Sequence, residues 1–134
     1  MSDSIDLGLS TTLTADFEDA VDRTRQALAA QGFGVLTEID MRATLKEKLG
    51  QEMEDYRILG ACNPPLAHRA VEADRNIGLL LPCNVVVRAD GPDATLVQAL
   101  DPQVMVQLSD AAELRAVADE ATGRLRAALD ALSG

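Results

Sequence analysis

The sequence predicts an α+β domain of two layers, in which a mostly antiparallel sheet is covered by helices in the order β-α-β-α-β-α-β-β-α. Segments in which every second residue is apolar alternate with segments in which apolar residues recur at three- and four-residue steps. Late in the chain, a turn signal joins two of the expected strands as a hairpin. No repeat or linker divides the 134 residues, a length that suits one core, so we expect a single domain over residues 1–134.

The first third of the chain predicts two strands and two helices. Alternating apolar residues indicate a strand over 5–13, and helical spacing over 16–31 indicates a helix that ends at Gly32. Alternation resumes over 33–39 as a second strand. Asp40 then offers a side-chain oxygen to cap a short second helix, which is mostly solvated.

The middle of the chain predicts a strand followed at once by a helix. The strand covers 56–62, and Asn63 as the cap with Pro64 at the first helical position begins the helix. On this helix His68 lies roughly 150° from the centre of the apolar stripe. We therefore expect the histidine to face away from the core.

The second half of the chain predicts a hairpin and a long final helix. Apolar residues over 79–87, interrupted by Pro82, indicate a buried strand, and a turn connects it to a partner strand over 95–100. The segment 101–108 begins with a cap-plus-proline signal, but its periodicity fits a helical turn or a strand end equally. A sustained helical stripe over 114–132 predicts the helix that closes the core.

Composition and charge exclude several classes of function. Asp and Glu total 22 against 12 Lys and Arg, and the net charge of -10 repels nucleic-acid phosphates and anionic lipid surfaces. Aromatic residues make up only 2%, so the chain has no set of rings on which bases could stack. We expect neither a nucleic-acid partner nor a membrane partner.

The N-terminal residues and the cysteines indicate a compartment. Residues 1–6 have no basic region followed by an apolar run, and every apolar run is far shorter than the ~18 residues that span a bilayer. We expect a cytoplasmic protein. In that reducing compartment Cys62 and Cys83 are expected to be thiols and not a structural disulfide.

The most distinctive stretches, 60–68 and 79–84, contain most of the candidate ligand-binding residues. Cys62 immediately precedes a helix start, where unpaired N–H groups and the helix dipole favour a thiolate, although a buried apolar role beside Ile58 is more typical of a free cysteine. His68 is the sole histidine and the natural acid–base candidate, although a lone histidine on a polar helix face is more often a solvated or interface residue. The full candidate set is Cys62, Asn63, His68, Cys83, Asn84 and Asp101.

The same residues carry no recognised metal or catalytic motif. Cys62, His68 and Cys83 are ligand types that zinc and copper accept, but a Cys-x-x-Cys pair is absent and we assign no metal. A redox pair of Cys62 and Cys83 needs Cα atoms within about 7 Å, which the sequence leaves open. A nucleophile elbow and a Gly-rich phosphate loop are also missing, so no cofactor can be named.

Several runs of the sequence resemble the family known as domain of unknown function 302. The resemblance reaches roughly from Leu9 to Leu132, and the runs that carry it are Phe33-Gly34-Val35, Tyr56 to Pro64, Ala67 to Ala70, Gly78 to Val85, and Asp101-Pro102. It implies an α+β fold in a small bacterial or archaeal protein that tends to form homodimers. It implies no established reaction, substrate or cofactor.

The region of Cys62, His68 and Cys83 is the basis of two hypotheses on function. The leading one is a homodimeric binding or structural module with a small-ligand or partner site there, because unusual residues gather without a complete catalytic set. The alternative is a thiol-redox or metal-dependent enzyme in which Cys62 reacts and His68 moves protons. Whether the chain is an enzyme stays open at this point.

Overall fold

The structure is a computed structural model, and it describes residues 7–133. Within them the strands are β1 Gly8–Leu13, β2 Gly34–Asp40, β3 Tyr56–Cys62, β4 Cys83–Ala89 and β5 Thr95–Leu100. The helices are α1 Phe17–Ala30, α2 Met41–Leu49, α3 Pro64–Ala73, the 3-10 helix η1 Arg75–Leu80, α4 Gln103–Leu108 and α5 Glu113–Ser133. The predicted α+β class and the order of its principal elements are confirmed.

One sheet of five antiparallel strands organises the described residues, in the order β1-β5-β4-β3-β2. The hairpin β4–β5 lies in the middle, and Gly91 takes the left-handed conformation in its turn, with φ 88°. The first strand pairs with the last, so that Gly8 lies opposite Leu100 and Leu13 opposite Thr95. β1 and β2 are therefore the two edges of the sheet.

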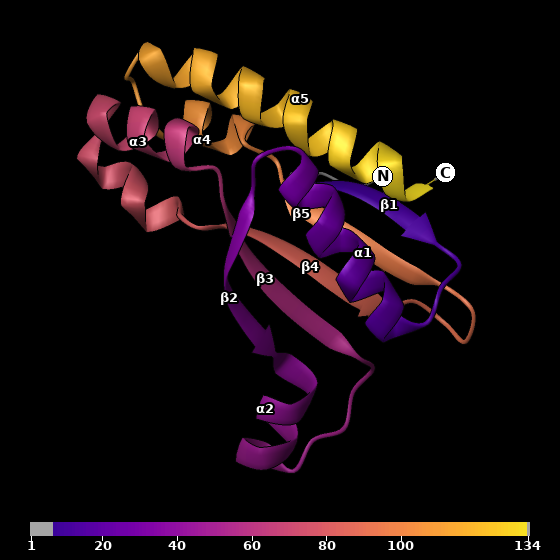
Figure 1. The fold of residues 1–134 in the computed structure, drawn as a ribbon. Helices are drawn as coiled ribbons and strands as arrows, with labels where there is room; N and C mark the ends of the chain where they lie inside the picture. The colour runs from indigo at the N-terminus through magenta and orange to yellow at the C-terminus, as the bar shows by residue number, and fades with distance from the viewer. Residues whose placement is uncertain (1–6, 134) are drawn as a thin grey trace, which may run out of the picture.

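Helices α1 and α5 cover one face of the sheet (Figure 1). Strand side chains alternate between faces, and those that point toward these helices are buried against Leu28 of α1 and Leu125 of α5. We call this larger core the sheet cluster; its central strand members are Leu59, Ala61, Val85, Val87, Val97 and Ala99. The opposite face, which includes Ile58 and Val86, stays half-buried.

A second core lies beyond one end of the sheet, where α3, η1 and α4 pack beside the first half of α5 (Figure 1). We call it the end cluster; its largest members are Leu66, Ile77, Met105, Leu114 and Val117. Because α5 runs along both cores, it joins the two clusters into one domain. None of the described helices is long and apolar enough to cross a bilayer.

The residues that predict the helix boundaries from sequence also form them in the structure. Asp40 accepts a hydrogen bond from the Ala43 N–H at 2.9 Å, and Asn63 accepts one from the Leu66 N–H at 3.3 Å. Gly32, which follows α1, has a positive φ of 87° that favours glycine. These signals predict the helix boundaries correctly because each depends on a few adjacent residues.

For the second half of the chain, one expectation needs revision and one open question is answered. The strand expected over 79–87 begins only at Cys83, because residues 75–80 form η1 and Ile77 packs into the end cluster. Asp74 starts η1 by accepting from the Asn76 N–H at 2.9 Å, and Pro82 has no N–H for the ladder. The open question over 101–108 is answered by α4. In the first predicted strand, Ile5 lies outside the described residues.

Candidate functional site

A small apolar cavity of about 50 Å³ lies where the sheet cluster meets the end cluster. Strand ends, α3, α4 and α5 all contribute to it, and small side chains on α3 and α5 leave the space. Its lining consists of Phe33, Ala61, Cys62, Asn63, Leu66, Ala67, Ala70, Leu80, Leu81, Cys83, Leu100, Pro102, Met105, Val117, Ala121 and Leu125. No charged side chain is among them.

Both cysteines contribute to this cavity. In the β3–β4 ladder Cys83 lies opposite Ala61, so Cys62 is the next residue along β3 from the partner of Cys83. Both are half-buried free thiols. The structure therefore brings the two sulfur-bearing residues to one place, although the sequence separates them by a helix and a 3-10 turn.

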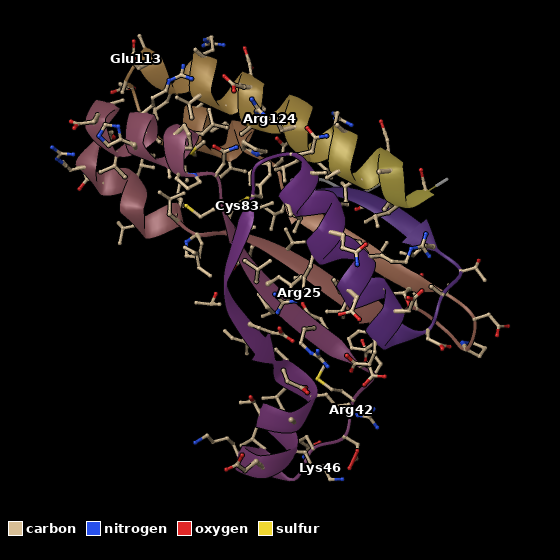
Figure 2. The ribbon with its side chains drawn as sticks, viewed as in Figure 1. Arg25, Arg42, Lys46, Cys83, Glu113 and Arg124 are labelled. Carbon is tan, nitrogen blue, oxygen red and sulfur yellow. The ribbon has the colours of Figure 1, made fainter. Side chains whose placement is uncertain are left out.

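Cys83 has the chemistry of a buried neutral thiol. Burial, with a smaller effect from the negative charge of Asp101, raises the pKa of Cys83 from 9.0 to about 11. Its Sγ donates a weak hydrogen bond to the Leu100 carbonyl at 3.6 Å, at the start of β4 where Figure 2 labels it. Because the nucleophilic form of cysteine is the thiolate, Cys83 is a poor nucleophile at neutral pH.

Asn63 lines the cavity, but its polar atoms are already used. Its carbonyl oxygen caps α3 through the Leu66 N–H, and its amide donates to the Gln31 carbonyl at 3.4 Å, where α1 ends. Gly32 keeps this contact close, since a Cβ there would lie 3.0 Å from the Asn63 amide nitrogen. Asn63 thus ties α1 to α3 and offers little to a ligand.

Asp101 and Asn84 lie outside the cavity. Asp101 accepts from the Gln103 N–H at 2.9 Å at the start of α4, and its neighbours Leu100 and Pro102 line the cavity in its place. Asn84 is exposed on the face of the sheet that the helices leave uncovered. Neither residue contacts the same space as the two cysteines.

His68 is separated from the cysteines by its orientation on α3. Its side chain is 74% exposed, as the helical spacing predicted, and its Nε2 lies 3.4 Å from Glu72 Oε1. It borders a surface hollow with Arg69, Glu72 and Glu113. The expected grouping of one imidazole with two sulfurs is therefore not found. Within residues 7–133, no group of three His, Cys, Asp or Glu side chains is arranged to hold a metal ion.

The aliphatic residues that form most of the cavity wall are not among the site residues predicted from sequence. Ala70, Ala121 and Leu125 enter the sequence prediction only as parts of apolar stripes, and Met105 lies in the segment 101–108, whose structure the sequence leaves open. A stripe predicts which face is buried, but not whether neighbouring stripes fill the space between them. Ala67 of α3 is a further small residue in the cavity wall.

The burial of Arg57 at the other end of the sheet is a second feature that the sequence does not predict. Its side chain is 13% exposed, and its guanidinium forms ion pairs with Glu18 at 2.9 Å and with Glu38 at 2.8 Å. It also lies 5.2 Å from the centre of the Phe17 ring. Arg25, which Figure 2 shows between α1 and the strands, pairs with Glu38 as well. These contacts attach α1 to β2 and β3, and so have a structural role.

Comparisons with known proteins find one matching family and a similar crystal structure. A family model described as "Domain of unknown function DUF302" matches residues 9–132. The chain belongs to the DUF302 family. A crystal structure of an uncharacterized conserved DUF302 protein from Bacillus stearothermophilus is similar, with a TM-score of 0.86 and 27% sequence identity. The similarity covers 94% of this DUF302 chain and 98% of the other. No curated protein matches it.

Proposed function

We propose that this DUF302 domain is a binding module whose cavity receives a short aliphatic group of a small-molecule ligand, without covalent chemistry at the cysteines. The observation that carries the proposal is the position of the cavity, between two separately packed cores and with only uncharged side chains around it. Apolar pockets of this kind take apolar groups. The two free thiols favour a reducing compartment, and we place the module in the cytoplasm.

The lining selects the chemistry of the ligand. The polar side-chain atoms of Asn63 already form hydrogen bonds with Leu66 and Gln31, and the Cys83 thiol donates to the Leu100 carbonyl. A charged ligand atom in the cavity would therefore have no partner, and burying it would cost several kcal/mol. The group that enters must be apolar, and any polar part of the ligand must stay outside.

The size of the cavity limits how much of the ligand it holds. Its volume of about 50 Å³ is roughly a third of the ~150 Å³ that accommodates benzene in an engineered apolar cavity. A group of three carbons, buried at ~0.8 kcal/mol each, contributes about 2.4 kcal/mol, or a factor of about 60 in affinity. The cavity is thus an anchor for one end of a ligand.

The thiol-enzyme hypothesis has less support. His68 lies on the exposed side of α3, and the pKa of Cys83 is raised, which disfavours the thiolate. Cys62 then has no base beside it among the residues that line the cavity. We therefore assign Cys62 and Cys83 a packing role around the bound group.

Xenon binding tests the cavity directly, because xenon enters dry apolar cavities. We expect saturable methyl chemical-shift changes on Leu66, Met105 and Leu125 under xenon pressure, and their loss in the variant Ala121→Val, which adds two methyl groups to the wall. Ala127→Val is the matched control, because Ala127 is exposed on the same helix. The substitution there lowers helix propensity by the same amount as Ala121→Val does.

Two results would overturn the proposal. One is wild-type protein with no saturable shift changes, and the other is Ala121→Val binding xenon as the wild type does. Mass spectrometry of an organic extract of protein purified from its own host then identifies the ligand, which we expect to contain a terminal aliphatic group.

A further inference from the structure

The face of the sheet opposite α1 and α5 carries a single charged side chain among the described strands. Side chains alternate between the two faces of a strand, and here three rows of them cross from β3 toward β5. The rows are Tyr56, Arg88 and Leu96 nearest the β4–β5 turn, then Ile58, Val86 and Gln98, and finally Gly60 and Asn84. The charged residue is Arg88, and we call this side of the sheet the open face.

Arg88 is a half-buried cation without an acidic partner. Among residues 7–133, the basic side chains that form no ion pair are Lys48, Arg88, Arg115 and Arg126. Arg88 alone of these four is half-buried, while the other three are exposed. A guanidinium has five N–H donors, and partial burial reduces the water that can accept from them. The site therefore favours an anion that the described part of the chain does not supply.

Apolar surface connects Arg88 to the cavity described above. Val86 is the next residue of β4 on the open face, and it borders a shallow hollow of about 190 Å³. In the β1–β5 ladder Gly8 lies opposite Leu100 and has no side chain to fill this space. The lining of the hollow is Leu7, Gly8, Asn84, Val86, Gln98, Ala99 and Leu100. Leu100 also lines the cavity, so the hollow lies between Arg88 and the cavity.

We propose that the ligand of this domain is a fatty acid, whose methyl end enters the cavity, whose chain lies in the hollow and whose carboxylate binds Arg88. This inference rests on the proposed function, because the cavity holds the end of the chain. A carboxylate accepts two parallel N–H bonds from a guanidinium. Tyr56 lies opposite Arg88 in the β3–β4 ladder, and its hydroxyl, which has no partner among the described residues, can donate a further bond.

Charge argues for a carboxylate and against a phosphate. One guanidinium balances one negative charge, whereas a phosphate ester brings a second charge that Arg88 alone does not balance. The net charge of -10 opposes any anion at long range, but salt screens this field beyond ~8 Å. At the open face the described strands present no carboxylate, so Arg88 dominates locally.

The strand geometry sets the length of the fatty acid. Arg88 lies four residues along β4 from Asn84, which borders the hollow beside Leu100, and at ~3.4 Å per residue the distance is about 14 Å. An extended carbon chain spans this distance with about eleven C–C bonds of ~1.5 Å at tetrahedral angles. The cavity of about 50 Å³ holds about three further carbons. The expected chain thus has roughly 14 carbons, which is the length of myristate.

Titration with myristate, followed by methyl NMR below the concentration at which micelles form, tests the site. We expect saturable one-to-one shift changes both on Val86 of the open face and on Leu125 of the cavity wall. Hexanoate is too short to reach from Arg88 into the cavity, and we expect it to bind at least about tenfold more weakly.

Variants separate the contribution of Arg88 from that of net charge. Arg88→Met removes the charge and keeps an unbranched apolar side chain, so myristate should bind at least about tenfold more weakly, while xenon binds as in the wild type. Arg88→Lys should lose less affinity because it keeps the charge. Arg126→Met is the matched control, because Arg126 also has no ion pair and is exposed on α5. Ala121→Val should weaken myristate binding by up to about 60-fold, the factor for three buried carbons. Circular dichroism verifies that all variants are folded.

Failure of this inference can be distinguished from failure of the proposed function. Wild-type protein that binds xenon but not myristate would overturn the fatty-acid inference alone, and protein that binds neither would overturn both. Unchanged affinity of Arg88→Met, or equal weakening by Arg126→Met, would remove Arg88 from the site.

Two further results would also overturn the inference. Shift changes confined to the open face or to the cavity would show that one ligand does not occupy both. Binding that begins only after residues 1–6 are deleted, or only after a pair of chains is diluted apart, would make that segment or a second copy the occupant of the open face.

Discussion

The raised pKa of Cys83 makes the stability of this domain depend on alkaline pH. Below pH 9.0 the thiol is protonated in both the folded and the unfolded chain, so its contribution is constant. Between pH 9.0 and about pH 11 the unfolded chain releases the thiol proton of Cys83, while the folded chain keeps it. The unfolded state then binds fewer protons, and the free energy of unfolding falls as pH rises.

The magnitude follows from the size of the shift. A rise from 9.0 to about 11 is two pH units, and at 1.36 kcal/mol per unit the loss reaches about 2.7 kcal/mol. Native domains have a total stability of only ~5–15 kcal/mol, so this loss is large enough to measure. Burial, the main cause of the shift, is also the reason that the thiolate is disfavoured in the fold.

Urea unfolding from pH 8 to pH 11 measures the effect, and the two cysteines provide a matched pair of variants. Cys83→Ala should lower stability at neutral pH and remove most of the alkaline loss, because the titrating group is gone. Cys62→Ala changes the other cysteine of the same cavity. Its free energy of unfolding should still fall at alkaline pH as that of the wild type does. Other groups titrate in this range, so the informative quantity is the difference between each variant and the wild type. An unchanged alkaline slope in Cys83→Ala would refute the reasoning, as would rapid alkylation of Cys83 at pH 7.

The remaining predictions concern two contacts that hold the fold around the site. Asn63→Ala should lower the free energy of unfolding by about 1–2 kcal/mol, because it removes the cap of α3 and the link to α1; urea unfolding checks it, and a cost near zero would contradict the capping role. Gly60→Ala should cost more than about 1 kcal/mol, since the new methyl would contact Thr37 Oγ1 and lie 2.8 Å from Pro82 Cγ. Gly34→Ala is its control, with no atom within 4 Å of the added carbon, and equal costs for the two variants would contradict this account.

Most of the helices and strands could be predicted because their signals are local. Asp40 and Asn63 each cap a helix through an N–H three residues away, and the alternation of β3 and β5 is visible within each strand. The pairing of β1 with β5 could not be predicted, since it joins residues from opposite ends of the chain. The prediction of a strand at residues 79–81 is wrong because an apolar run has the same appearance whether it pairs in a sheet or packs against helices.

The candidate site could be predicted only in part, because contacts between distant segments are not visible in the sequence. His68 was placed correctly on the exposed side of α3, yet it was grouped with the cysteines because it is near Cys62 in sequence. Cys62 and Cys83 do share a cavity, which depends on the β3–β4 register. The cavity itself arises from imperfect filling between two cores, and this is a property of three-dimensional packing that no single segment of sequence contains.

The position of β1 between β5 and solvent has a consequence for biosynthesis. β1 leaves the ribosome long before its partner β5, which ends at Leu100. Until then β1 and the β5-side edge of β4 both expose unpaired backbone groups, which are the surfaces through which nascent chains associate wrongly. Closing a sheet through such distant segments is slow. The growing polypeptide therefore passes through a long interval in which these two strand edges are open to wrong association.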